Sequence, residues 1–239
     1  MSAVSAAMQR LLAFNERQLD RHRPKTDGPV EFSFPWTKRL EANWEVIAAE
    51  VDTLIARRIN LPQVNDVVGS DQGNEGSWSN FVLFSYGTWL DMNVERCPRT
   101  AELVRDVAGL QVAGFTVLGP RSHLPRHRGP KRGTLRYQIG LRVPEPPGSC
   151  RIEVGSVMHT WFEGATLMFD DSVEHEAWND SDAERFVLFV EVTWPFPGVT
   201  GLLNRLTQRA FSLAARSFPT RIVELDAILN PQPQSDDAS

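Results

Sequence analysis

The chain has 239 residues, an apolar fraction of 41%, a charged fraction of 23% and a formal net charge of −5. These values are typical of a globular protein of one domain, and the acidic balance disfavours nucleic acid as its main partner. The sequence contains no apolar run near the roughly 18 residues that a bilayer span needs. We find no pattern of a secretory signal, and Cys97 and Cys150 stand in no paired motif. We therefore expect a cytoplasmic protein.

Helical periodicity dominates the N-terminal part of the chain. Apolar residues recur at helical spacing over residues 3–23 and again over residues 38–58. We therefore predict a helical N-terminal part over residues 1–60. The next stretch, residues 60–77, is rich in Gly, Asn, Asp and Ser, which predicts an irregular loop.

After this loop the pattern changes from helices to strands. Residues 78–89 are apolar and aromatic, and a short helix is expected over 98–107, with Thr100 as its cap and Glu102 in its first turn. Further strands are predicted, in chain order, over residues 114–118, 134–143, 150–154, 165–169 and 186–194. Many short strands with few helices between them indicate a sandwich or barrel, with its core over about residues 78–196.

The strand predicted over residues 134–143 shows the clearest alternation. Its apolar face carries Leu135, Tyr137, Ile139, Leu141 and Val143, and its other face carries Arg136, Gln138, Gly140 and Arg142. The apolar face belongs to a core. The polar face fits either a solvent-exposed surface or a site, and this segment alone leaves both open.

A last amphipathic helix is expected over about residues 200–217, before a disordered tail at 230–239; a single domain then spans residues 1–229. The helix places Leu202, Leu203, Leu206, Ala210 and Leu213 near one face and Arg205, Arg209 and Arg216 around the rest. Packing of the apolar face on the barrel, or on a second subunit in a homodimer, is its commoner use. Peripheral contact with an anionic membrane is the less favoured alternative.

Histidines in the strand-rich half are the candidates for chemistry. The chain has five histidines; His123 and His127 lie in RSHLPRHRGPKRG, and His175 lies in FDDSVEHEAWND. A lone histidine is more often a surface or hydrogen-bonded structural residue than a ligand. The order of the residues around these histidines therefore has to carry the assignment.

The segment from His127 to Pro195, which contains HRGPKRGTLRYQIGLRVPEPPG and later FDDSVEHEAW, closely resembles the aspartyl/asparaginyl β-hydroxylase family. The upstream segments WSNFVLFSYGTWLDMNVERCPRTAELV and GFTVLGP are similar to this family and its lipid-hydroxylase relatives. The resemblance implies a mainly β fold, a double-stranded β-helix of the jelly-roll, cupin-like kind with flanking N- and C-terminal helices. It also implies Fe(II), 2-oxoglutarate and dioxygen as cofactor and cosubstrates.

By this resemblance, His127 and His175 are the two metal ligands. In most enzymes of this chemistry a carboxylate two residues after the first histidine completes a facial triad. Here that position is Gly129, and the family shares this absence. Asp171 is then implied as a catalytic residue that hydrogen-bonds a metal-bound water or orients an imidazole, whereas Asp170 reads equally well as a turn former.

The resemblance also implies a set of residues that bind the cosubstrate. Arg185 matches the arginine that anchors the distal carboxylate, for which a planar guanidinium is well suited. Arg136 matches a second active-site arginine that meets the cosubstrate or an acidic substrate. Thr116 takes the place of a hydroxyl residue that assists Arg185. Gln138 stands where the family commonly has a histidine; it donates a hydrogen bond but cannot become cationic.

The implied activity is hydroxylation of an unactivated C–H bond. The substrate is of an amino-acid type, resembling Asp or Asn and free, carrier-tethered or peptidyl, or it is the acyl chain of a lipid. Two alternatives remain. A non-catalytic ligand-binding barrel would share the fold, although both histidines and Arg185 speak against it. A halogenase would place a halide at the vacant carboxylate position.

Overall fold

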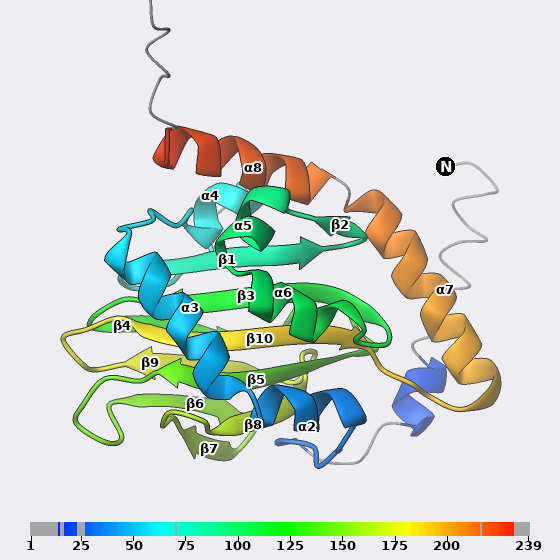
Figure 1. Cartoon of the computed structure of the whole chain (residues 1–239). Helices are drawn as coiled ribbons and strands as arrows, with labels where there is room; N and C mark the ends of the chain where they lie inside the picture. Colours follow the sequence, from blue (N-terminus) through cyan, green and yellow to red (C-terminus); the bar gives the residue numbers. More distant parts are fainter. Residues whose placement is uncertain (1–13, 15–16, 23–26, 70, 216, 232–239) are drawn as a thin grey trace, which may run out of the picture.

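The computed structural model describes residues 14, 17–22, 27–69, 71–215 and 217–231, in which two antiparallel sheets face each other beneath a layer of helices (Figure 1). Residues 17–22 are helical, and the rest of the helix expected over 3–23 lies largely outside the described residues. Most of the tail expected at 230–239 also lies outside them.

The strand order defines the architecture. The larger sheet has the order β2-β1-β3-β10-β5-β8 and the smaller sheet the order β4-β9-β6-β7. The strands are β1 Trp78–Ser85, β2 Thr88–Trp89, β3 Leu110–Leu118, β4 Ser122–His127, β5 Thr134–Arg142, β6 Cys150–Val154, β7 Val157–Thr160, β8 Thr166–Asp170, β9 His175–Asn179 and β10 Arg185–Thr193. From β3 to β10 the chain passes back and forth between the two sheets, which is the double-stranded β-helix that the sequence predicted.

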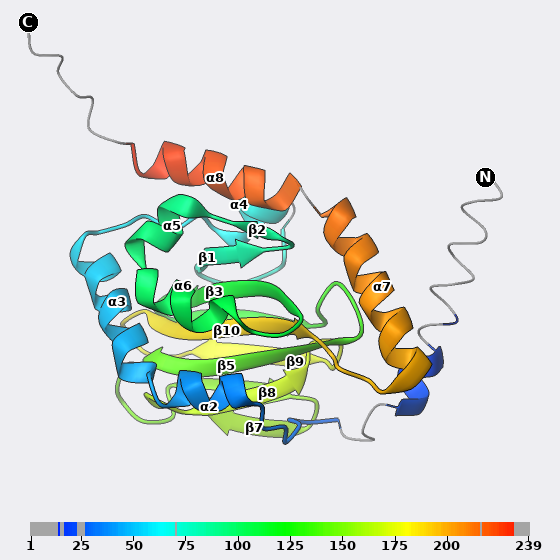
Figure 2. The same cartoon turned by 45° about the vertical axis from the view of Figure 1, so that its right-hand side comes forward.

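Helices cover the outer face of the larger sheet. These are α2 Pro35–Glu41, α3 Trp44–Ala56 and α6 Pro98–Arg105, and they cross this face in both views (Figures 1 and 2). The alternation of β5 explains the contact, because Leu135, Tyr137, Ile139 and Leu141 join the apolar core beneath the helices. The opposite face of β5 turns Arg136 and Gln138 into a pocket between the sheets, so this face is not a solvent-exposed surface.

A second apolar core lies between the two sheets. It consists of buried residues from both sheets and their connections: Leu118, Leu124, Cys150, Ile152, Val154, Trp161, Ala165, Leu167, Phe169, Val173, Ala177 and Val187. Both cysteines are buried and free. Because β10 packs against helices on one face and against this core on the other, all nine of its residues are buried.

The helix predicted over 38–58 is two helices. The chain turns at Asn43, whose backbone (φ −124°, ψ 16°) is not helical and whose Nδ2 donates to the carbonyl of Arg39 at 2.8 Å. An asparagine side chain competes in this way for backbone groups that a continuous helix would use. Likewise, the strand predicted over 78–89 is the hairpin of β1 and β2, turning at Tyr86 and Gly87 with φ of 47° and 95°.

Several other local predictions need correction. The expected loop at 60–77 contains α4 (Val64–Val68), and α5 (Asp91–Arg96) and the strands β4, β7 and β9 were not predicted. Thr100 does not cap α6. Its backbone N and Oγ1 instead donate to Glu50 of α3, at 2.8 and 2.6 Å, so Thr100 ties two helices together.

The C-terminal segment forms α7 (Gly198–Ala214) and α8 (Ser217–Leu229), which run along one end of the barrel and over β1 (Figure 2). On α7 it is the polar residues Asn204 and Gln208 that are buried, whereas Leu202, Leu206 and Leu213 are 50%, 48% and 58% exposed. The prediction that the leucine face packs on this barrel is therefore wrong. None of the helices in the described ranges is long and apolar enough to cross a bilayer.

Candidate active site

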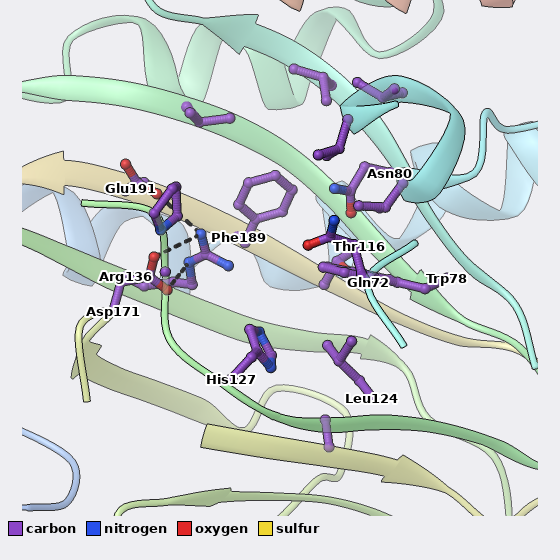
Figure 3. A pocket seen from close by; sticks show the side chains of 18 of the residues that line it. Gln72, Trp78, Asn80, Thr116, Leu124, His127, Arg136, Asp171, Phe189 and Glu191 are labelled. Carbon is purple, nitrogen blue, oxygen red and sulfur yellow. Dashed lines mark hydrogen bonds and ion pairs between the residues drawn. The ribbon is translucent and has the colours of Figure 1, made fainter. Parts of the chain in front are cut away.

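A cavity of about 470 Å³ lies between the sheets and reaches the C-terminal helices (Figure 3). Every site residue predicted from the sequence lines it: Thr116, His127, Arg136, Gln138, Asp171, His175 and Arg185. The remainder of its wall is largely apolar. We call one part of this wall the apolar arm and define it by Val64, Val67, Val82, Val112, Phe211, Phe218 and Ile222.

The two histidines face each other across the smaller sheet. His127 ends β4 and His175 begins β9, the two are direct partners in the ladder, and their ring centroids are 4.2 Å apart. Nδ1 of His127 lies 2.8 Å from the carbonyl of Pro125, and Nδ1 of His175 lies 2.9 Å from that of Val173. A carbonyl only accepts hydrogen bonds, so each Nδ1 carries the proton and each Nε2 keeps a free lone pair.

Burial keeps both imidazoles neutral. It lowers the pKa of His127, and it lowers the pKa of His175 to about 3, with the neighbouring His127 contributing in the same direction. Neutral imidazoles with unprotonated Nε2 atoms are the form that binds a transition metal. The pair therefore fits a metal without rearrangement of its hydrogen bonds.

Asp171 occupies the space beside Gly129. A Cβ built on Gly129 would lie 1.7 Å from Oδ2 of Asp171, and the Gly129 amide donates to the Asp171 carbonyl at 2.8 Å. The carboxylate also approaches the histidines, with Oδ1 at 3.9 Å from Nε2 of His175. Gly129 thus leaves room for a carboxylate that comes from a different segment. Asp170, in contrast, accepts from the backbone N and Oγ of Ser172 and forms the turn.

Arg136 lies among acidic groups at one end of the cavity. Its Nε is 2.9 Å from Oδ1 of Asp171, and its Nη2 is 3.0 Å from Oε2 of Glu191 (Figure 3). Nζ of Lys131 lies 2.7 Å from the other oxygen of Glu191. We call these four residues, Lys131, Arg136, Asp171 and Glu191, the charge cluster. Its two cations balance its two carboxylates.

The pKa values of the two acids in the cluster are shifted in opposite directions. Burial raises the pKa of Asp171 to about 6, although Arg136 opposes the shift. Burial also acts to raise the pKa of Glu191, but Lys131 and Arg136 together outweigh it and hold that pKa below its usual range. Glu191 is therefore the firmly ionised partner of both cations.

Arg185 has the opposite environment. Its side chain is buried, and none of the described carboxylates pairs with it. Burial lowers the pKa of Arg185 to about 10, so the guanidinium is still charged at neutral pH. A buried cation without an internal partner is costly unless an anion joins it. The arginine thus marks a place for a bound anion.

Thr116 lies on the same face of the larger sheet as Arg185, since it pairs with Val187, two residues further along β10. Its Oγ1 accepts a hydrogen bond from Nε1 of Trp78 at 3.0 Å, and both side chains line the cavity (Figure 3). Gln138 is buried on the neighbouring strand β5. Thr116 and Gln138 therefore contribute polar atoms to the wall that carries Arg185.

Glu191 and Lys131 were not identified from the sequence. A signal was present in both cases: Glu191 is the only charged residue between Arg185 and Trp194, in the apolar run FVLFVEVTW, and Lys131 lies in the HRGPKRG motif. A lone acid in a buried strand needs a partner. No spacing rule shows that its partners are Lys131 and Arg136, because these come from a loop and a strand more than fifty positions away.

The side chains fit a metal held by two protein ligands. Within the ranges that the structure describes, no group of three or more His, Cys, Asp or Glu side chains is arranged around a common point. His127 and His175 present two lone pairs, and the Asp171 carboxylate lies on one side of them. Such a site leaves several coordination positions to small molecules.

The fold and the pocket define a class: a cupin-like double-stranded β-helix whose cavity holds two neutral histidines and an arginine that pairs with none of the described carboxylates. The family model described as aspartyl/asparaginyl beta-hydroxylase matches residues 41–195. The chain belongs to this family, as the sequence motifs predicted.

Two similar proteins agree with this assignment, and one solved structure is given with them for comparison of the fold. The ornithine lipid ester-linked acyl 2-hydroxylase of Rhizobium tropici is 37% identical over 72% of this chain and 62% of its own length. The aspartyl/asparaginyl beta-hydroxylase of Homo sapiens is 30% identical over 72% of this chain, which spans only 22% of that protein. A prolyl-4-hydroxylase structure from Pseudomonas putida covers 77% of the chain and 99% of its own, with 16% identity and a TM-score of 0.43.

Proposed function

We propose that the protein is an Fe(II)- and 2-oxoglutarate-dependent hydroxylase. The observation that carries this proposal is the presence, in one cavity, of two histidines with free Nε2 lone pairs and a buried arginine that no carboxylate of the described part of the chain contacts. A dicarboxylic oxo acid matches both features, because one end chelates a metal and the other carries the missing negative charge.

In this proposal His127 and His175 hold the iron. When bound, the iron and the oxo acid would allow dioxygen to act as the oxidant: one oxygen atom would enter succinate as the oxo acid loses carbon dioxide, and the other would enter the C–H bond of the substrate. The chain's own contribution is to orient the reactants and exclude water. The Nδ1 hydrogen bonds to Pro125 and Val173 fix both rings for this task.

Arg185 would bind the distal carboxylate of 2-oxoglutarate, with Thr116 and Gln138 as neutral hydrogen-bonding groups on the same wall. Arg136 has a different part, because Asp171 and Glu191 already engage its guanidinium. It holds the Asp171 carboxylate beside the histidines. There Asp171 would accept a hydrogen bond from a water on the metal.

The alternatives fit the pocket less well. A halogenase needs a vacant, anion-accepting position next to Gly129, but the carboxylate of Asp171 occupies that space. Bringing a halide beside this carboxylate would bury two like charges close together. A non-catalytic barrel gives no reason for a buried, unpaired Arg185 next to two histidines.

For the substrate we propose the acyl chain of a lipid rather than an amino-acid side chain. The apolar arm continues from the histidines to α7 and α8, and it is lined by valines, Phe211, Phe218 and Ile222. An extended hydrocarbon gains free energy from such a wall, whereas the polar backbone of a peptide would lose hydration there. The name of the Rhizobium tropici relative, an acyl 2-hydroxylase, points the same way.

The test is succinate formation after anaerobic loading with Fe(II) and admission of oxygen, with 2-oxoglutarate and acyl lipids or, separately, Asp- and Asn-containing peptides. We expect iron-dependent succinate and a hydroxylated acyl chain from the wild type and neither from His127→Ala or His175→Ala. Arg151→Met, which removes a partly exposed arginine paired with Asp180, serves as the control and should stay active. Succinate without any need for iron, or no iron binding and no turnover with any candidate, would overturn the proposal.

A further inference from the structure

Helix α7 carries an apolar face that points away from the protein. Val199, Leu202, Leu206 and Leu213 are exposed, and their spacing of three, four and seven residues places them on one stripe. We call them the α7 stripe. In a helix that covers a core the apolar side faces inward, whereas in α7 the apolar side faces outward and the polar side faces the barrel.

Hydrogen bonds on the opposite face fix this orientation. Nδ2 of Asn204 donates to the carbonyls of Gly133 and Trp194 at 2.8 and 3.1 Å, and Nε2 of Gln208 donates to that of Arg132 at 2.7 Å. These carbonyls belong to the ends of barrel segments. Those of Gly133 and Trp194 each accept one backbone N–H as well, from Trp194 and Phe196, so Asn204 supplies their second hydrogen bond. Rotating α7 to bury its leucines would break all three bonds, so the stripe stays outward.

We propose that the α7 stripe seats the protein on an anionic lipid surface. Arg205 and Arg209 lie next to the stripe, are exposed, and pair with no carboxylate of the described residues. The protein as a whole is acidic, with a net charge of −5, but the surface beside the exposed leucines carries these two cations. An apolar stripe bordered by arginines is the pattern of a helix that lies in the membrane interface.

The position of α7 favours a membrane over a second copy of the chain. In a two-fold contact between α7 helices, the same unpaired arginines of both copies would approach one another. A membrane meets the arginines with phosphates instead. Phe211 of α7 and Phe218 of α8 also line the apolar arm, so the helix that carries the stripe walls the cavity as well. The docking itself does not depend on the proposed chemistry.

The test is cosedimentation of the full chain with vesicles, without iron or 2-oxoglutarate, so that its outcome is independent of catalysis. We expect binding to phosphatidylcholine vesicles that contain phosphatidylglycerol, and weaker binding as salt is raised. Leu202→Asp combined with Leu206→Asp should weaken binding at least about tenfold, since two leucines no longer enter the interface. Arg205→Glu combined with Arg209→Glu should remove the preference for phosphatidylglycerol.

The matched control is Val157→Asp combined with Met158→Asp, because these β7 residues are 46% and 47% exposed, much like the two leucines. This variant should bind as the wild type does. The proposal is overturned if the wild type stays in the supernatant with every vesicle, or if the leucine variant binds like the control. A wild-type dimer that the leucine variant dissociates, without vesicle binding, would assign the stripe to a second copy of the chain.

Discussion

Two arginines on neighbouring strands of the larger sheet line the same cavity and have opposite surroundings. Arg136 on β5 contacts two carboxylates, Asp171 and Glu191, and Lys131 completes a balanced charge cluster. Arg185 on β10 is buried without a carboxylate among the described residues. A buried charge that the protein itself neutralises maintains the structure, whereas one left without a partner indicates where a ligand supplies the counter-charge.

The largest expected effect comes from removing one carboxylate of the balanced charge cluster. Glu191→Gln leaves Lys131 and Arg136 with a single carboxylate between them, and we expect the free energy of unfolding to fall by about 3 kcal/mol. Urea unfolding measures this loss. The control is Glu153→Gln, which removes the partly exposed partner of Arg126 and should cost less than about 1 kcal/mol. Equal losses of unfolding free energy in Glu191→Gln and Glu153→Gln would show that the buried charge cluster stabilises the protein no more than a surface ion pair does.

The same ion pair predicts a pH dependence. Because Lys131 and Arg136 hold the pKa of Glu191 below its usual range against the opposing effect of burial, its stabilisation is present above the unfolded-state pKa of about 4.3. It is lost as the pH falls through the lowered folded-state pKa. The difference in unfolding free energy between wild type and Glu191→Gln should therefore be constant at and above about pH 8, where Asp171 with its pKa of about 6 is ionised as well, and shrink in strong acid, where Glu191 takes up its proton.

Substitution of Arg185, the arginine without a carboxylate partner among the described residues, should weaken ligand binding and not lower the stability of the protein. Arg185→Met removes a buried charge without a partner, so the free energy of unfolding should stay the same or rise. Anaerobic binding of 2-oxoglutarate should weaken about 100-fold, the range observed when one member of a buried charge pair is removed. Calorimetric titration and urea unfolding of the same sample test both parts. A large loss of stability with unchanged binding would reverse the assignment of the two arginines.

Gly129 tests whether the position of Asp171 is fixed by space. In Gly129→Ala the new Cβ would stand 1.7 Å from Oδ2 of Asp171, and overpacking of this kind costs about 2 kcal/mol. The clash displaces the Asp171 carboxylate from the histidines, so the rate of iron-dependent succinate formation should fall as well. In an Asp171→Ala background the same substitution should cost clearly less, since the clashing group is gone. Equal costs in both backgrounds, measured by urea unfolding, would exclude this contact as the cause.

The sequence alone predicted those strands in which the spacing of apolar residues follows from burial of the strand. The alternation in residues 134–143 identified β5 and its apolar face, but left open whether the polar face was a surface or a site; the apolar run after Arg185 identified β10. The smaller sheet was missed in part, because β4 and β9 are short, and polar residues such as His127 and His175 interrupt their apolar pattern. Resemblance to a family, not spacing, led to the site residues there.

Charge partners and orientation depend on contacts between distant segments. Nothing in the sequence around Arg136 indicates Glu191, which lies on the neighbouring strand but 55 positions along the chain. Packing of the α7 leucines on the barrel, one of the two uses predicted for that face, was wrong for a similar reason. The hydrophobic pattern of α7 favours burial of the leucines, but Asn204 and Gln208 instead face the barrel and donate to the carbonyls of Gly133, Trp194 and Arg132. Hydrogen bonds between distant segments cannot be read from the spacing of apolar residues.

The smallest expected effect tests this last explanation. Asn204→Ala removes one of the two donors of each of two backbone carbonyls at the end of the barrel, and we expect the free energy of unfolding to fall by about 1 kcal/mol. Leu206→Ala on the opposite, exposed face should change it by less than about 0.5 kcal/mol. Like the charge cluster, the polar face of α7 would then contribute to stability through contacts inside the protein. The leucine face, like Arg185, would contribute only when a partner is bound. A larger loss for Leu206→Ala than for Asn204→Ala, measured by urea unfolding, would mean that the leucines stabilise the isolated chain, and the parallel between α7 and the two arginines would fail.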